Sequence, residues 1–455
     1  MPLENDHDCL IIGSGPIGTA AAIRLATKGL RVLILEAGEA IIEPLGSHFR
    51  NQPIFQKEPD SYFAAIDPYL NNFTKPENPL LGLADSSLLG GQGVLWTNNC
   101  PRAADFELWG AMSPSEWAQR YSEAEALLQV TPNPAAKSVT GSKVQAQLMS
   151  VLENGRSIQG LPLSGHIQAD NSVYFNAPRD MLLATPQEVQ ARIEVWSATK
   201  VTKLVHENGR IDSVWIETAD GEQEMGVGTA VLLASGAVST PQLLHNSNIH
   251  VNKLGRGFSF HALLFGQVVL NSALSAHEAT KDIEPRLWIP STVNFPWHIQ
   301  VMRDTFPIPT SEPVTNPNRL LEFQAFLPIA FRDKNRFIFS DTEPVAVEFA
   351  FSEQDQAQMA AMEADVRQLA SQIGRWRGGG EPVWVPHGTA HLVGTCRMEH
   401  ENWRGVANTS GQVHGFDNLY LATVGLIPTP VAVNPTLTAV ALALQTCEAI
   451  GRVGI

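Results

Sequence analysis

Two polar side chains near the end of the chain, those of His391 and Asn434, have the chemistry to act on a single hydroxyl group. An ordinary histidine has a pKa of ~6.5, so it can take a proton from a hydroxyl group at neutral pH. The amide of an asparagine can hold the oxygen of the same group by a hydrogen bond. The pair therefore suits the oxidation of an alcohol, in which a base takes the hydroxyl proton while the carbinol carbon gives up a hydride.

Each of the two residues also has a purely structural interpretation. For any one of the 13 histidines, a hydrogen bond to a carbonyl group in the core is the default expectation. His391 differs because it opens the turn His391-Leu-Val-Gly-Thr-Cys-Arg-Met398, where a side chain can project into a cleft. Asn434 precedes a proline at the start of an expected helix, which is typical of an N-cap. For Asn434, helix capping and substrate binding are compatible. For His391, these residues alone leave open both a structural hydrogen bond in the core and a role in a cleft.

The helix that is expected to begin at Pro435 and Thr436 adds an electrostatic contribution. Its positive end would stabilise a negative charge that develops on a cofactor bound in front of it. Two further histidines, His261 and His298, are weaker candidates, which could line the same cleft or simply pack.

A dinucleotide site is indicated at the N-terminus. An apolar run leads into Gly13-Ser-Gly15-Pro-Ile-Gly18, a helical pattern follows over residues 19–28, and a second apolar run ends at Glu36. This is a βαβ unit with the dinucleotide fingerprint. The glycines let the backbone approach a pyrophosphate at the helix N-terminus, and Glu36 would accept hydrogen bonds from ribose hydroxyls. A plain glycine turn is the alternative. The strand before the glycines, the helix after them and Glu36 at the end of the next strand together favour dinucleotide binding.

A second glycine-rich segment reads Leu89-Gly-Gly-Gln-Gly-Val-Leu-Trp-Thr-Asn-Asn-Cys-Pro101. Gly90 and Gly91 are expected to approach a ligand closely, and a simple turn is the alternative. Farther along, Asn208-Gly209 and Asp220-Gly221 predict hairpin turns. A buried strand is expected from Ala230, with a helix starting at Pro241, and the pattern over residues 353–374 predicts an amphipathic helix.

The overall composition excludes several classes of protein. The net charge of −15 argues against binding to nucleic acid or to an anionic membrane. The four cysteines have no metal-type spacing, no other metal cluster or GxSxG elbow is present, and reduced buried thiols in a cytoplasmic protein are expected. We expect neither a signal peptide nor a membrane-spanning segment.

Taken together, these blocks resemble the glucose-methanol-choline (GMC) family of flavin oxidoreductases. The resemblance rests on the two glycine segments, on Glu36 and on the blocks 391–398 and 434–438. It is stronger still toward the pyranose 2-oxidases and bacterial glycoside 3-oxidases, through Pro296-Trp-His-Ile-Gln-Val-Met-Arg-Asp304 and Asn335-Arg-Phe-Ile-Phe-Ser-Asp341. The resemblance implies FAD as the cofactor and His391 with Asn434 as the catalytic pair.

The resemblance also implies roles for individual residues. Gln300 and Asp304 correspond to sugar contacts, and Gln324 stands where an arginine is expected near the sugar. Thr97, with Trp96 in the same block, falls where the family has a threonine near the flavin N5 and O4.

Two departures from the family pattern change what is expected. Leu95 takes the place of the flavin-linking histidine, so the FAD is expected to be non-covalent. Met302 replaces a histidine of the sugar segment, which argues against glucose itself as the substrate.

The predicted fold class is α/β, with a Rossmann-like FAD-binding domain and an α+β substrate domain on a mostly antiparallel sheet. The expected FAD-binding domain is discontinuous and comprises residues 1–45, 85–135, 190–262 and 388–455. The substrate domain comprises 136–189 and 263–387, and residues 46–84 form an irregular lid or cofactor cover.

The predicted function is FAD-dependent oxidation of a ring secondary hydroxyl (C2 or C3) of a sugar or glycoside to a ketone. Oxygen or another acceptor would reoxidise the flavin. A non-sugar alcohol as substrate, or a non-catalytic flavin-binding protein, are the alternatives. Because no oligomerisation arm is visible, a monomer or weak dimer is expected.

Overall fold

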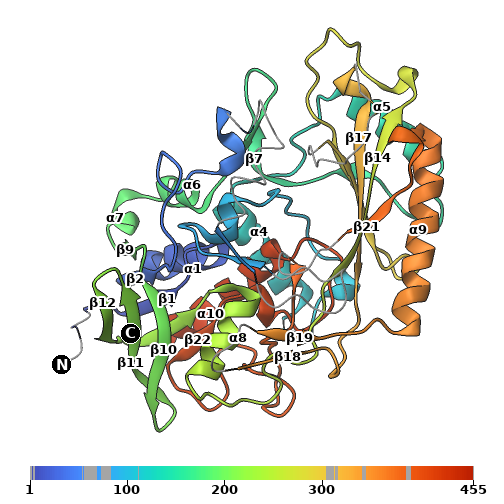
Figure 1. Cartoon of the computed structure of the whole chain (residues 1–455). Coiled ribbons are helices and arrows are strands. Elements are labelled where there is room, and N and C mark those ends of the chain that lie inside the picture. The colour runs from blue at the N-terminus through green and yellow to red at the C-terminus, as the bar shows by residue number, and fades with distance from the viewer. Residues whose placement is uncertain are drawn as a thin grey trace.

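The computed structural model of the chain combines a parallel sheet with a large antiparallel sheet, and Figure 1 shows the two at opposite sides of the molecule. This architecture confirms the predicted α/β class with a second, antiparallel sheet. The structure describes residues 3, 6–53, 55, 69–72, 84–110, 112–303, 312, 316–340, 345–385 and 391–453. Most of the expected lid, 46–84, lies outside these ranges, and so does Asp304.

The parallel sheet carries the predicted dinucleotide unit. Its spatial order is β22 (Leu419–Leu421), β13 (Ala230–Leu233), β1 (Cys9–Ile12), β2 (Val32–Leu35) and β9 (Ile193–Trp196). Every residue of β13, β1 and β2 is buried, as expected for strands covered on both faces. Helix α1 (Pro16–Thr27) joins β1 to β2, and α10 (Thr436–Val453) packs against α1. The sheet therefore places the glycine turn and Glu36 at neighbouring strand ends.

Helix α8 begins earlier than its sequence suggests. It spans Gly236–Asn246, so the prediction that it starts at Pro241 was wrong. A proline inside a helix has no N–H for the carbonyl four residues before it. Here that carbonyl belongs to Ala237, and the Thr395 hydroxyl donates a hydrogen bond to it at 2.7 Å. A side chain from far along the chain thus replaces the missing donor.

A three-stranded antiparallel sheet lies between strands β9 and β13 of the parallel sheet in the sequence. It consists of β10 (Lys200–Glu207), β11 (Arg210–Thr218) and β12 (Gly221–Gly226). The turn between β10 and β11 has positive φ at Asn208 (50°) and Gly209 (78°), which is why Asn-Gly suits it. Both predicted hairpins are confirmed.

The antiparallel sheet forms the other side of the molecule. Its spatial order is β20 (Gly374–Trp376), β14 (His261–Leu270), β17 (Leu320–Pro328), β16 (His298–Met302), β15 (Arg286–Ile289) and β6 (Gln159–Gly160), and β21 (Val383–Val385) also pairs with β14. Helix α9 (Glu353–Ile373) runs along this sheet in Figure 1 and confirms the predicted amphipathic helix.

Alternate residues of this sheet point to opposite faces. Val301 and Phe323 belong to the same hydrophobic cluster as Met362 of α9, so one face packs on that helix. Gln300 and Gln324 pair across β16 and β17 and therefore lie on the other face. This second face turns toward the parallel sheet and carries the polar residues of interest.

The remaining elements connect the two sheets. The strands are β3 (Leu70–Asn72), β4 (Ala84–Ser86), β5 (Val130–Thr131), β7 (Leu163–Ile167), β8 (Val173–Phe175), β18 (Arg336–Ile338) and β19 (Ala346–Glu348). The helices are α4 (Pro114–Leu127), α5 (Val139–Met149), α6 (Pro178–Leu183) and α7 (Gln187–Gln190). Helices α6 and α7 pack on α1, although the expected boundaries assign most of them to the substrate domain. The exact boundaries stay a prediction.

Candidate active site

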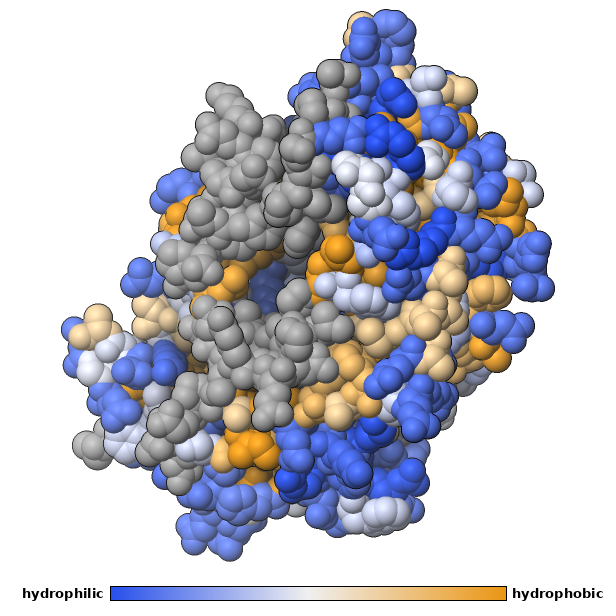
Figure 2. All heavy atoms as spheres, turned by 45° about the vertical axis from the view of Figure 1, so that its right-hand side comes forward, coloured by the Kyte–Doolittle hydropathy of each residue, from blue (hydrophilic) through white to orange (hydrophobic). Residues whose placement is uncertain are grey.

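A cavity of ≈ 570 Å³ lies where the parallel and antiparallel sheets approach each other. Both the glycine turn after β1 and the cavity-facing strands of the antiparallel sheet contribute to its wall. On the face shown in Figure 2, hydrophobic residues gather around a central hollow, while the edges are mostly hydrophilic. Lining residues that the sequence had singled out are Gly13, Gly15, Glu36, Gly91, Trp96, Thr97, Gln324, His391, Asn434 and Thr436.

The glycine turn after β1 leaves no room for side chains at two of its positions. A Cβ atom at Gly18 would lie 2.1 Å from the carbonyl oxygen of Gly13, and Gly13 itself has a φ of 108°. A Cβ at Gly15, by contrast, would meet no protein atom within 4 Å, and Gly15 lines the cavity. Gly13 and Gly18 therefore shape the turn, and Gly15 offers open space to a ligand.

The carboxylate of Glu36 is held at the end of β2 by three donors. It accepts hydrogen bonds from the backbone N–H and the hydroxyl of Ser14, at 2.9 and 2.7 Å, and from the N–H of Gly38 at 2.9 Å. Burial raises the pKa of Glu36, although these bonds oppose the rise. A carboxylate offers about four acceptor positions, so one remains for a ligand hydroxyl.

The second glycine segment packs directly against the first. The N–H of Gly90 donates to the Ser14 hydroxyl at 2.8 Å, and a Cβ at Gly91 would lie 3.2 Å from Cα of Gly15. Both residues have positive φ, 95° and 55°. The predicted close approach of Gly90 and Gly91 is therefore toward the other glycine turn, with Gly91 also lining the cavity.

His391 and Asn434 meet on the wall of the same cavity. Nδ2 of Asn434 lies 3.1 Å from Nε2 of His391, and both side chains line the cavity while being only 7–8% exposed. Helix α10 begins at Thr436, so Asn434 lies two residues before it and not directly before it as an N-cap, and Thr436 also lines the cavity. Pro435 is buried and is not among the lining residues. The pair combines a proton acceptor with a hydrogen-bond donor around one small space.

The buried side chain of Gln300 holds Asn434 from behind, and two further buried side chains contact Gln300. Nε2 of Gln300 donates to Oδ1 of Asn434 at 2.6 Å and lies 3.1 Å from Nε2 of His298. Nδ2 of Asn99 donates to Oε1 of Gln300 at 2.9 Å. Gln300 is fully buried and does not line the cavity, so the structure places it behind Asn434.

Three other residues singled out in the sequence lie on the cavity wall itself. Gln324 is 8% exposed, and its amide has no hydrogen-bond partner among the described residues. The indole N–H of Trp96 is likewise buried without an acceptor in that part of the chain. The Thr97 hydroxyl lies 3.3 Å from Nδ2 of Asn99. Gln324 and Trp96 thus have polar groups available to a ligand.

One histidine is more closely connected to the site than its sequence context indicates. His261 is 2% exposed, and its Nδ1 lies 2.8 Å from Nδ1 of His391. Its sequence context makes it only a weak candidate that could line the cleft or simply pack, because no local motif distinguishes it. Asn99 was not singled out at all, although it lines the cavity and supports Gln300.

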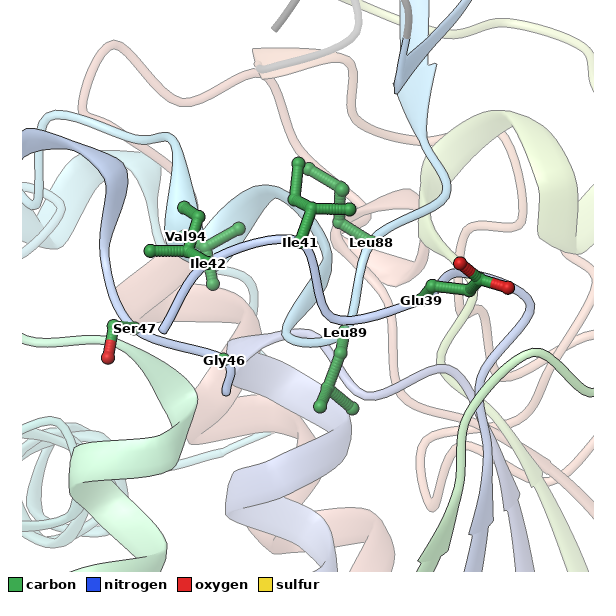
Figure 3. A pocket seen from close by; sticks show the side chains of 8 residues that line it. All are labelled: Glu39, Ile41, Ile42, Gly46, Ser47, Leu88, Leu89 and Val94. Carbon is green, nitrogen blue, oxygen red and sulfur yellow. The ribbon is translucent and has the colours of Figure 1, made fainter. Parts of the chain in front are cut away.

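A second, much smaller hollow is shown in Figure 3. Its volume is ≈ 10 Å³, and its wall consists mainly of aliphatic side chains such as Ile41, Ile42, Leu88 and Val94. A volume of this size holds at most one water molecule. This hollow is therefore a packing defect and not a ligand site.

The described residues also bear on metals and membranes. No group of three or more His, Cys, Asp or Glu side chains among them could hold a metal ion. None of the helices described is long and apolar enough to cross a membrane. The four cysteines are buried free thiols.

Comparison with known proteins decides the family. A model for FAD dependent oxidoreductases matches residues 8–270, which is more than half of the chain, and a model for GMC oxidoreductases matches residues 340–443. The chain belongs to the GMC family of FAD-dependent oxidoreductases. FAD is thus the cofactor of this GMC oxidoreductase, as predicted.

Relatives that align over nearly their whole length agree with this assignment. The GMC oxidoreductase is 27% identical to a pyranose 2-oxidase from Tricholoma matsutake, over 97% of this chain and 93% of the relative. It is also 27% identical to a C-glycoside 3-oxidase from Microbacterium trichothecenolyticum, over 96% and 95%. A solved structure of a formate oxidase variant from Aspergillus oryzae has a TM-score of 0.72, covering 99% of this chain and 98% of that one. At 13% identity this last likeness shows the fold alone.

Proposed function

We propose that this GMC oxidoreductase oxidises a ring secondary hydroxyl, at C2 or C3, of a sugar or glycoside to a ketone. The observation that carries the proposal is that His391 and Asn434 open onto the same cavity as the glycine turn and Glu36. One cavity thus offers both a dinucleotide cradle and a base with a hydrogen-bond donor. The substrate class is supported by the relatives, named pyranose 2-oxidase and C-glycoside 3-oxidase.

The cavity wall indicates which residues would hold FAD. Gly15 and Gly91 would lie against the pyrophosphate, with Glu36 on the ribose hydroxyls. Thr97, the indole N–H of Trp96 and the start of α10 at Thr436 would lie near the flavin ring. When bound, FAD supplies the acceptor for the hydride of the carbinol carbon.

The protein supplies the proton chemistry. Nε2 of His391 takes the proton of the substrate hydroxyl as the carbon–hydrogen bond breaks. Nδ2 of Asn434 lies 3.1 Å from Nε2 of His391, so it can donate a hydrogen bond to the same substrate oxygen and keep it in place while it becomes a carbonyl. The backbone N–H groups at the start of α10 give this end of the cavity a positive potential.

Recognition of a sugar requires both polar and apolar contacts. Gln324 projects into the cavity without a partner among the described residues, so it can bind a hydroxyl group. Phe326 and Leu263 lie on the same wall and suit the apolar C–H face of a pyranose ring. Gln300 acts on this site through Asn434, and a direct sugar contact for it stays a prediction, as does one for Asp304, which lies outside the described residues.

The apolar wall also favours a second candidate, a non-sugar alcohol. Leu263, Phe326 and Val385 line the cavity together, and such a surface would bind a hydrocarbon group as well as a sugar ring. The fold is compatible with either substrate.

A panel of compounds tested by anaerobic flavin bleaching separates these functions. Free pyranoses, C- and O-glycosides and simple alcohols are each mixed with the enzyme, and the flavin absorbance is followed at ~450 nm. Rapid bleaching by pyranoses or glycosides is the expected result. Bleaching by simple alcohols alone would support the second candidate, and a flavin that no alcohol reduces would indicate a non-catalytic flavoprotein.

The attachment of FAD gives a simpler prediction. Leu95 lines the cavity where the family pattern has its flavin-linking histidine, and a leucine side chain cannot form such a bond. Among the described lining residues, His391 is the one histidine, and no cysteine or tyrosine is present. We expect acid precipitation to release FAD into the supernatant. Yellow colour that stays with the precipitated protein would contradict non-covalent binding.

The assembly state gives another prediction. The chain shows no candidate oligomerisation arm in its sequence, so we propose a monomer or weak dimer. Light scattering at low micromolar concentration should give a mass close to that of one chain, 49.5 kDa. A stable species of four chains would overturn this prediction.

A further inference from the structure

His261 occupies a fully enclosed position behind the proposed base. It is the first residue of β14 and is only 2% exposed. Its Nε2 lies 2.6 Å from the carbonyl oxygen of Val431, and its Nδ1 lies 2.8 Å from Nδ1 of His391. It does not line the cavity, so it reaches the substrate only through His391.

The Val431 carbonyl determines where the protons of both imidazole rings reside. A carbonyl oxygen only accepts, so Nε2 of His261 must carry a hydrogen. In a neutral imidazole the other nitrogen is then an acceptor. Burial lowers the pKa of His261 to about 4, which keeps its ring neutral at pH 7. Nδ1 of His391 must therefore carry a hydrogen, and its Nε2 is left with a lone pair.

An independent chain of hydrogen bonds reaches the same nitrogen from the other side. Oδ1 of Asn434 accepts from Gln300 at 2.6 Å, which turns Nδ2 of Asn434 toward Nε2 of His391. Oε1 of Gln300 in turn accepts from Asn99 at 2.9 Å, so the Gln300 amide is also oriented. An N–H group directed at Nε2 requires a lone pair there. Both chains thus agree on one tautomer of His391.

The backbone that carries the Val431 carbonyl is itself fixed. Oε1 of Glu107 accepts a hydrogen bond from the N–H of Ala432 at 2.7 Å, and the Thr429 hydroxyl donates to the carbonyl oxygen of Glu107 at 2.7 Å. Glu107 is buried and also accepts from Ala104 at 2.9 Å. The carbonyl that begins the first chain therefore has a rigid support.

We propose that His261 is a positioning residue that fixes the tautomer and ring orientation of His391, so that Nε2 is the basic nitrogen presented to the substrate. This inference rests on the proposed function, because it assigns His261 a role in the proton transfer to His391. Without His261, the His391 ring could carry its proton on either nitrogen. A ring with the proton on Nε2 cannot accept the hydroxyl proton there.

Three substitutions separate positioning from packing. In His261→Asn the amide oxygen falls near the former Nδ1 and can still accept from His391. In His261→Gln the amide group reaches the former Nε2 position and can still donate to Val431, but no acceptor faces His391. His261→Phe keeps the ring volume and removes both hydrogen bonds. His166→Ala, at an exposed position on β7, serves as the matched control.

The first readout is anaerobic flavin reduction by a substrate that bleaches the parent enzyme, measured over substrate concentration and pH. We expect the limiting rate to fall roughly 10²-fold in the Gln and Phe variants, within the range for loss of a partner that orients a catalytic imidazole. The Asn variant should stay within about tenfold of the parent, since the acceptor is retained. The apparent substrate dissociation constant and the FAD content should change little.

The second readout does not depend on activity. Nitrogen-15 NMR of histidine-labelled holoenzyme should show His391 with its hydrogen on Nδ1 in the parent and in His261→Asn, and a mixture of tautomers in His261→Gln. Equal rates in the Gln and Asn variants, or an unchanged His391 tautomer in His261→Gln, would overturn the inference. If His391→Ala itself reduces the flavin at the parent rate, the proposed function fails instead, and the NMR result still reports on His261.

Discussion

Replacement of His391 with alanine is expected to leave FAD bound and to lower the rate of flavin reduction by roughly 10²–10⁴, the usual contribution of a general base. The side chain contacts His261 and Asn434, neither of which belongs to the glycine turn, so its removal should leave the cradle for FAD unchanged. The loss should be smaller at high pH, where the ionised alcohol no longer needs a base. Stopped-flow reduction of the flavin across pH measures both effects.

Two further variants sharpen this test. Asn434→Ala should be less severe, because it removes one orienting hydrogen bond of about 1–3 kcal/mol. Its FAD content must be measured first, because Asn434 lies only two residues before α10. His166→Ala, at an exposed site, should match the parent. If His391→Ala reduces its flavin as fast as the control, the base lies elsewhere.

Substitution of Gly15 with alanine is expected to weaken FAD binding without harming the fold. The added Cβ would meet no protein atom within 4 Å, and the φ of −60° suits alanine. The methyl group would instead enter the part of the cavity proposed for the pyrophosphate. Overpacking of this kind costs about 1–3 kcal/mol, which corresponds to roughly 5- to 150-fold weaker binding. FAD titration of apoprotein, with thermal unfolding of the apo form, separates affinity from stability.

Alanine substitutions at two other glycines serve as comparisons for Gly15→Ala. Gly110→Ala also adds a methyl group in open space, but away from the cavity, so both affinity and stability should match the parent. Gly18→Ala should destabilise the apoprotein itself, because its Cβ would lie 2.1 Å from the Gly13 carbonyl oxygen. Undiminished FAD affinity in Gly15→Ala would contradict the placement of the pyrophosphate at this turn.

The sequence predicted the elements whose residues are adjacent in the chain. The βαβ unit around Gly13 and Glu36, the hairpin at Asn208-Gly209 and helix α9 each carry a local pattern with a physical cause. The start of α8 could not be predicted in this way. Its interior proline is tolerated because Thr395, more than 150 positions away, donates to the carbonyl of Ala237.

The residues of the candidate site also fall into those with a local sequence pattern and those whose roles depend on distant parts of the chain. His391 and Asn434 could be proposed because each stands beside a recognisable turn or helix start, and the structure brings them together. The role of His261 depends on a carbonyl 170 positions farther along the chain, and that of Gln300 depends on Asn434. Such relations arise only when the two sheets pack against each other, and no spacing within one segment reports them.

The central claim is that a ring secondary carbon of a sugar gives its hydride to the flavin of this enzyme. It is tested most directly by anaerobic single turnover with a glycoside that bleaches the flavin, carrying deuterium at C2 or at C3, followed by product analysis. The account predicts one equivalent of keto-sugar for each flavin bleached, with slower bleaching when deuterium is on the carbon that becomes the ketone. Bleaching rates that are the same with deuterium at either carbon, without a keto-sugar product, would contradict it.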